Sequence, residues 1–154
     1  MIKRLVHSID IDARPERVWQ VLTDLSVYPE WNPFILRAEG RVQVGDGLTL
    51  RMRPVGGRAA TFRPTVVEAT EPTHLRWKGR LGVPKVLDAD HEFRIEALPN
   101  GRTRLTQDEH FSGLLVPLVA RSLERGTLPA FAATNAALKE RAEKALTPRP
   151  VGEG

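Results

Sequence analysis

The sequence contains no cysteine among its 154 residues. This absence excludes disulfide bonds, a thiol nucleophile and a zinc site with cysteine ligands. A chain without disulfides fits a reducing compartment, and we expect a cytoplasmic protein. The four histidines are scattered without the spacing of metal ligands, and there is no glycine-rich phosphate-binding loop. We therefore expect neither a metal nor another cofactor.

Long apolar runs are also missing. A membrane-spanning helix needs roughly 20 consecutive apolar residues, and no stretch of this sequence approaches that length. The basic N-terminus is followed by Asp10 and Asp12, so the apolar region that a signal peptide requires does not develop. We expect a soluble, intracellular protein without a membrane span.

Charge of one sign is not concentrated anywhere. The net charge is +4, but the 23 basic residues are spread over the chain and most lie near one of the 19 acidic residues. Nucleic-acid binding requires a clustered basic stripe, so we expect no nucleic-acid partner. The length suits one domain, which we predict over residues 1–146 in a monomer or homodimer. Residues 147–154 contain two prolines and two glycines and are predicted to be a disordered tail.

The N-terminal part of the chain predicts one strand and two short helices. Apolar and polar residues alternate from Leu5 to Asp12, which is the period of a strand with one buried face. Pro15 suits the first turn of a helix, and the apolar spacing that follows predicts a helix from about Pro15 to Leu25. Residues 28–34 combine three aromatics with two prolines, a composition that favours a short helical turn.

The middle of the chain predicts a sheet. Short apolar runs are separated by turn residues, and they indicate six strands near residues 35–43, 48–54, 60–70, 74–80, 86–97 and 103–112. The last two strands should form a hairpin around Asn100. If their buried faces coincide, paired residue numbers sum to about 200, which places Phe93 opposite Gln107 and His91 opposite Glu109.

The C-terminal part predicts helix, because apolar residues recur at alternating spacings of three and four. The stripe consists of Leu128, Phe131, Asn135, Leu138, Ala142 and Leu146. Pro117 suits a helix start. Gly126 and Pro129 predict either a kink or a break between a short leading helix and a long final one.

Four segments resemble one known superfamily. They are IDARPERVW at 11–19, YPEWNPF at 28–34, RTRLTQDEHFSG at 102–113 and NAALKER at 135–141. With the order of the elements, they resemble the SRPBCC superfamily, the START-like, helix-grip group that includes polyketide cyclases, plant hormone receptors and lipid-transfer domains. The resemblance implies an α+β helix-grip fold, in which a seven-stranded curved antiparallel sheet wraps around a long C-terminal helix. It also implies two short helices between the first two strands and a ligand cavity between sheet and helix.

The inward face of the predicted sheet is not purely apolar. The alternation places His7, His91, Gln107 and Glu109 on it, and the helix stripe adds Asn135. Buried polar groups need partners or water. A pocket that holds solvent, or a ligand with polar atoms, accounts for all five.

His91 and Glu109 form the sharpest pair, because cross-strand neighbours have side-chain bases about 5 Å apart. Three interpretations remain open: a structural hydrogen bond, a contact that orients a ligand, and acid–base catalysis, for which the two are the candidate catalytic residues. The full set predicted to bind a ligand is His91, Gln107, Glu109, Asn135, Trp77, Phe93, Phe111, Phe131, Leu50, Met52 and His7.

The leading functional hypothesis is binding of a small hydrophobic molecule by a carrier or sensor. The alternatives are a polyketide cyclase or dehydratase type of enzyme that uses His91 and Glu109, and an interaction module similar to the chaperone activators of the superfamily. A ligand site should offer at least roughly 300 Å³. We interpret Gly56-Gly57 and Gly82-Val83-Pro84 as loops at the mouth of the cavity, since comparable loops act as gates in plant hormone receptors of similar fold.

Overall fold

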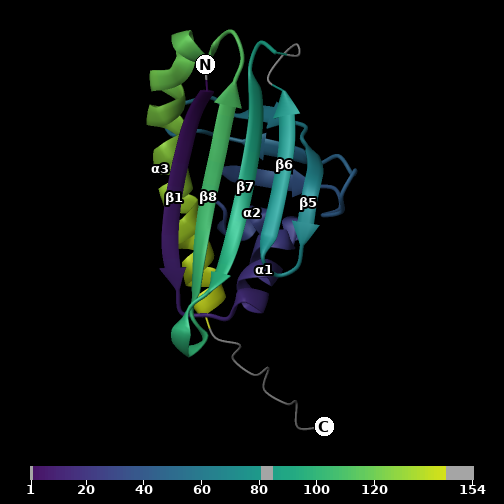
Figure 1. Cartoon of the computed structure of the whole chain (residues 1–154), viewed down its shortest axis with the longest axis vertical. Helices are drawn as coiled ribbons and strands as arrows, with labels where there is room; N and C mark the ends of the chain where they lie inside the picture. The colour runs from purple at the N-terminus through teal and green to yellow at the C-terminus, as the bar shows by residue number, and fades with distance from the viewer. Residues whose placement is uncertain (1, 81–84, 145–154) are drawn as a thin grey trace.

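The computed structural model describes residues 2–80 and 85–144. Two antiparallel sheets and one long helix form most of it (Figure 1). The strands are β1 (Ile2–Ile11), β2 (Ile35–Glu39), β3 (Thr49–Met52), β4 (Ala60–Phe62), β5 (Thr65–Thr70), β6 (His74–Arg80), β7 (Asp88–Ala97) and β8 (Thr103–Ser112). The helices are α1 (Pro15–Thr23), η1 (Leu25–Val27), α2 (Tyr28–Trp31), η2 (Pro99–Gly101) and α3 (Val116–Glu143).

The core lies between the two sheets and α3. The large sheet has the strand order β1-β8-β7-β6-β5, and the small sheet has the order β2-β3-β4. In Figure 1, α3 runs behind β1 and β8, while the small sheet crosses behind the other strands. This arrangement confirms the predicted α+β helix-grip class.

The strand count differs from the prediction, because residues 60–70 form two strands instead of one. The chain leaves the small sheet after β4 and joins the large sheet as β5. Pro64 lies at the crossing point and has no N–H to donate to a ladder. Its carbonyl accepts a hydrogen bond from the Leu48 amide at 2.8 Å instead. Eight strands in two sheets therefore replace the seven strands predicted in one.

Helix α3 is continuous through both Gly126 and Pro129. Of the two predicted alternatives, the break into two helices is therefore wrong, and the kink stays a prediction. Gly126 instead marks a close approach of the loop between β3 and β4. A Cβ on Gly126 would lie 3.3 Å from Pro54 Cβ, and the Gly126 carbonyl accepts a hydrogen bond from the Val55 amide at 3.0 Å. In the described part of the chain, no helix is long and apolar enough to cross a membrane.

The register of the β7–β8 hairpin is as predicted. His91 pairs with Glu109 and Phe93 with Gln107. Asn100 takes a positive φ of 65° in the turn, a conformation that asparagine tolerates better than most residues. The hairpin therefore carries its polar residues onto the inward face at fixed positions.

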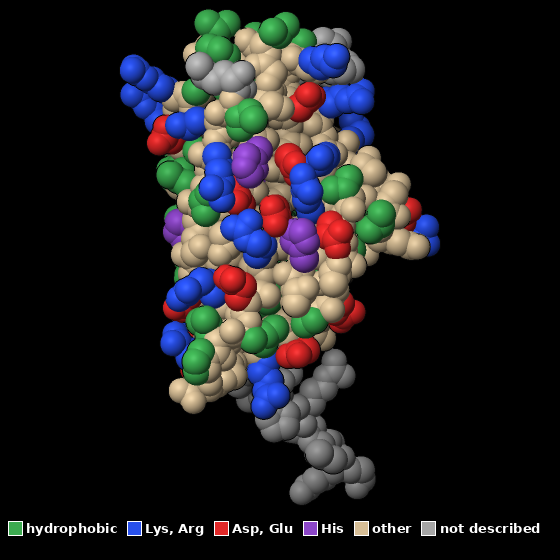
Figure 2. All heavy atoms as spheres, in the orientation of Figure 1, with side chains coloured by type: hydrophobic (Ala, Val, Ile, Leu, Met, Phe, Trp, Pro, Cys, Tyr) green, Lys and Arg blue, Asp and Glu red, His purple; other side chains and the backbone are tan. Residues whose placement is uncertain are grey.

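The outer face of the large sheet is polar and carries charges of both signs, as Figure 2 shows. Asp108 is the most enclosed of these charges, with 2% of its side chain exposed. Arg4 donates to its two oxygens at 2.9 and 2.6 Å, and Arg94 donates at 3.2 Å. The hydrogen bonds from Arg4, more than any other contact, lower the pKa of Asp108. These pairs cover the outer face, so the apolar face of the sheet is the inner one.

Gly79 on β6 allows the two sheets to meet. A Cβ at this position would lie 2.4 Å from Phe62 Cζ and 3.2 Å from Pro64 Cα. Phe62, at the end of β4, therefore occupies the space that a side chain on residue 79 would need.

We predict that Gly79→Ala destabilises the protein by about 1 to 3 kcal/mol, the usual cost of overpacking. Gly47→Ala is the matched control, because a Cβ there meets nothing within 4 Å. Urea unfolding of both variants provides the measurement. Equal stabilities of the two variants would contradict this account of how the sheets pack.

Candidate ligand-binding cavity

A cavity of about 200 Å³ lies where the large sheet, the small sheet and α3 converge. Ten of the fourteen residues that line it are apolar. The lining residues are Phe34, Ile35, Met52, Pro54, Arg58, Ala60, Phe62, Trp77, Ala89, His91, Glu109, Phe111, Leu123 and Thr127. The space is therefore an apolar chamber with few polar groups.

The cavity is smaller than the roughly 300 Å³ expected of a ligand site, and this volume counts against both the carrier and the enzyme hypothesis for a drug-sized ligand. A cavity of roughly 150 Å³ with apolar walls is nevertheless known to bind benzene. A volume of about 200 Å³ therefore still admits a compact molecule.

The structure brings five of the predicted binding residues to the cavity wall: Trp77, His91, Glu109, Phe111 and Met52. The other six, Gln107, Asn135, Phe93, Phe131, Leu50 and His7, are not among the lining residues. Several of these six contact the lining residues from behind. They position the site without forming its surface.

The prediction missed the part of the wall that α3 provides and, apart from Met52, the part that the small sheet and its flanking loops provide. Leu123 and Thr127 lie four residues apart, and Thr127 lies four before Phe131, so both extend the helix stripe toward its start. That signal was in the sequence, but the expected break near Gly126 obscured it. Phe34, Arg58 and Phe62 reach the cavity only because of how the small sheet crosses the large one.

Aromatic rings hold the His91 imidazole on three sides. The ring stacks on Phe93 with centroids 4.5 Å apart, meets Phe131 edge-on at 5.0 Å and lies 5.4 Å from Trp77. His91 is 5% exposed. The packing leaves the ring little freedom to turn, so its two nitrogens face fixed partners.

A chain of hydrogen bonds connects His91 to α3 and to β1. His91 Nε2 lies 3.0 Å from Gln107 Oε1, and Gln107 Nε2 donates to Asn135 Oδ1 at 2.6 Å. Asn135 Nδ2 lies 2.9 Å from His7 Nδ1. Four of the five predicted polar residues therefore form one network that links α3 to three strands, β7, β8 and β1.

The backbone carbonyl of His7 fixes the direction of this chain. Asn135 Nδ2 lies 3.3 Å from that oxygen, which accepts hydrogen bonds and cannot donate them. The amide of Asn135 must therefore point its NH₂ at His7 and its oxygen at Gln107. Gln107 then donates to Asn135, and its own oxygen accepts a hydrogen bond from His91 Nε2.

Glu109 faces the other nitrogen of His91. Its Oε2 lies 3.4 Å from His91 Nδ1, and the residue is 6% exposed. Glu109 also lines the cavity, and Oε1 is the carboxylate oxygen that does not form the contact with His91.

The sequence matches one known protein family over almost the whole described chain. Residues 3–143 match the family described as polyketide cyclase / dehydrase and lipid transport. The chain belongs to this family. Its members share the START-like architecture that the sequence motifs indicated. A comparison with curated protein sequences gives no match.

Solved structures of similar fold agree with membership in the polyketide cyclase / dehydrase and lipid transport family. The Zhui aromatase/cyclase from Streptomyces sp. R1128 has a TM-score of 0.77 at 23% identity, over 99% of both chains. A START superfamily protein from Mycobacterium smegmatis has a TM-score of 0.69 at 22% identity, over 92% of this chain and 97% of its own. A norcoclaurine synthase from Thalictrum flavum has a TM-score of 0.72 at 13% identity, over 92% of this chain and 94% of its own. These likenesses show a shared fold.

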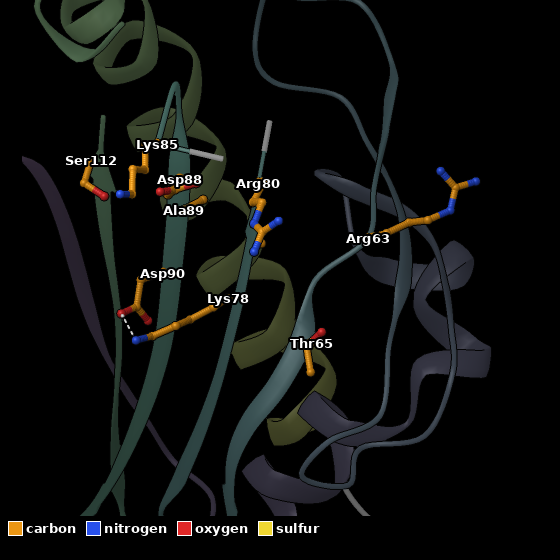
Figure 3. A pocket seen from close by; sticks show the side chains of 10 residues that line it. Arg63, Thr65, Lys78, Arg80, Lys85, Asp88, Ala89, Asp90 and Ser112 are labelled. Atoms are coloured by element: carbon orange, nitrogen blue, oxygen red, sulfur yellow. Dashed lines mark ion pairs between the residues drawn. The ribbon is translucent and has the colours of Figure 1, made fainter. Parts of the chain in front are cut away.

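A larger hollow of about 770 Å³ lies on the outer side of β6 and β7. Its walls are mostly polar and charged, and Figure 3 shows Lys78 and Asp90 pointing toward one another while Arg63 points away. Lys78 and Asp90 form an ion pair at 3.5 Å. An open groove with charges of both signs favours water, so the smaller apolar cavity is the better candidate for a ligand site.

Of the two loops predicted at the mouth of the cavity, the structure describes one. Residues 82–84 lie outside the described part of the chain. Pro54 and Arg58 flank Gly56-Gly57 and both line the cavity, which places this loop at its edge. In residues 2–80 and 85–144, no three acidic or histidine side chains converge as metal ligands would.

We predict that Asn135→Leu destabilises the protein by about 2 to 4 kcal/mol, because Gln107 and His7 each lose a buried partner. Thr134→Val is the matched control on the same helix. The buried Thr134 hydroxyl has no partner among the described residues, so its removal should be neutral or slightly stabilising. Urea unfolding compares the two. If both variants lose the same stability, the network does not hold helix and sheet together.

Proposed function

We propose that this protein binds a compact hydrophobic molecule in the cavity between the two sheets and α3, as a carrier or sensor. One observation carries the proposal: ten of the fourteen residues that line the cavity are apolar, and its polar residues include a buried carboxylate–imidazole pair, Glu109 and His91. Membership in a family described by cyclase, dehydrase and lipid-transport activities supports it.

The physical driving force is burial of apolar surface. Protein interiors are packed so closely that few voids exceed the size of a water molecule. A space of about 200 Å³ is therefore unusual for a core that only supports the fold. Filling it with an apolar ligand gains about 25 cal/mol for each Å² removed from water.

The enzymatic alternative is favoured by one contact, His91 with Glu109 beside the cavity. A general acid or base must reach the reacting atom within hydrogen-bond distance. Both nitrogens of His91 already face protein partners, Gln107 Oε1 and Glu109 Oε2. In a cyclase or dehydratase of this geometry, Glu109 would be the catalytic residue and His91 a positioning residue. Ligand binding does not require a free nitrogen on His91, so we prefer the binding function to the enzymatic one.

The interaction-module alternative has weaker support. Ile2, Leu114 and Leu118 are exposed by 67%, 80% and 81%, and Ile2 pairs with Ser112 at the same end of the large sheet. Nothing in the structure indicates what would cover them. The cytoplasmic location, the monomeric or dimeric state and the lack of a nucleic-acid partner stay predictions.

We predict that Ala89→Leu abolishes ligand binding without unfolding the protein, because the added atoms occupy the cavity that Ala89 lines. Met52 also lines the cavity and is one of only two methionines, so its labelled methyl group gives a simple NMR probe. Toluene should shift the Met52 methyl resonance saturably in the wild type and should not do so in Ala89→Leu.

The control carries the same substitution on the exposed face of α3, Ala136→Leu. This variant should respond to toluene as the wild type does. A wild type that shows no saturable shift, or an Ala89→Leu variant that still binds, would refute the proposed site.

A further inference from the structure

The hydrogen-bond chain determines where His91 carries its proton. Gln107 presents an oxygen to His91 Nε2 at 3.0 Å, and the orientation of that amide follows from Asn135 and the His7 carbonyl. Nε2 is therefore protonated. Nδ1 is left to face Glu109 Oε2 at 3.4 Å.

Glu109 is the acidic residue among those that line the cavity. Its Oε2 is turned toward His91 Nδ1, so Oε1 is the oxygen left for a ligand. Arg58 is the other charged residue at the cavity, but it is exposed and forms no ion pair with the described residues.

An ionised carboxyl group only accepts hydrogen bonds. The polar atom that Glu109 offers to the cavity, Oε1, is therefore a hydrogen-bond acceptor. Thr127 also lines the wall, but its hydroxyl can donate or accept, so it does not select between donors and acceptors.

The cavity volume sets the size of the ligand. About 200 Å³ is somewhat more than the roughly 150 Å³ of a cavity that holds benzene. One aromatic ring with one or two small substituents matches this volume. Trp77, Phe34 and Phe111 line the wall, and aromatic walls favour the stacked or edge-on contacts of an aromatic ligand.

From these observations we propose that the ligand is a single-ring aromatic molecule whose polar end is a hydrogen-bond donor, the hydroxyl of a phenol or an aryl alcohol, with the donor directed at Glu109 Oε1. This inference builds on the proposed function, since it assigns a ligand class to the same cavity. A ligand with only an acceptor at that end would leave Oε1 without a partner and would set two acceptors against each other.

The test compares 4-methylphenol with 1,4-dimethylbenzene, which has the same shape and carries a methyl group in place of the hydroxyl. Titration calorimetry on the full-length protein should show that 4-methylphenol binds about tenfold more tightly than 1,4-dimethylbenzene. The reason is that a hydrogen bond to a charged group is stronger than one between neutral groups. Glu109→Met should remove the preference and still bind 1,4-dimethylbenzene, which shows that the cavity is intact. Glu109→Gln keeps an acceptor oxygen and should retain part of the preference.

The outcomes separate this inference from the proposed function. If both compounds bind with equal affinity, the donor inference is overturned and the cavity remains a hydrophobic site. If neither binds while toluene still shifts Met52, the ligand class is overturned alone. If toluene also fails to bind, the proposed function is refuted together with the ligand class. A preference that persists in Glu109→Met would show that another group selects the donor.

Discussion

The hydrogen bond from Asn135 to the backbone carbonyl of His7 is the constraint on which the polar half of the site depends. A carbonyl can only accept, so this contact orients the Asn135 amide, then the Gln107 amide, then the His91 ring. The same bond joins α3 to β1 across the core. Stability and site geometry therefore depend on one contact. The polar residues of the otherwise apolar interior are explained together, because they belong to this one hydrogen-bond chain.

Much of this site was predictable because a strand has a period of two. The alternation along β7 and β8 and the turn at Asn100 determined which residues share the inward face, and hence that His91 lies opposite Glu109. The period does not say which residue on a shared face lines a void. Phe93 and Phe131 were predicted to contact the ligand, but they pack against the His91 ring. Their position behind the wall depends on rotamers and on α3.

The remaining wall depends on tertiary geometry that local patterns do not contain. Pro64 lies between β4 of the small sheet and β5 of the large sheet. The lack of a side chain at Gly79 leaves the space that Phe62 occupies. Gly126 suggested the end of a helix, although its function is to admit the Pro54–Val55 loop. A glycine in a helical pattern has two interpretations, the end of a helix or the close approach of another segment. Only the neighbouring elements distinguish them.

Membership in the family identifies the architecture, and a shared architecture does not transfer an activity. The direct test of the account is the protonation of the His91 ring, measured by long-range ¹H–¹⁵N spectra of the ¹⁵N-histidine-labelled protein, with the signal assigned through His91→Gln. We predict a proton on Nε2, donated to Gln107. A ring that carries its proton on Nδ1 alone would reverse the hydrogen-bond chain and contradict the account.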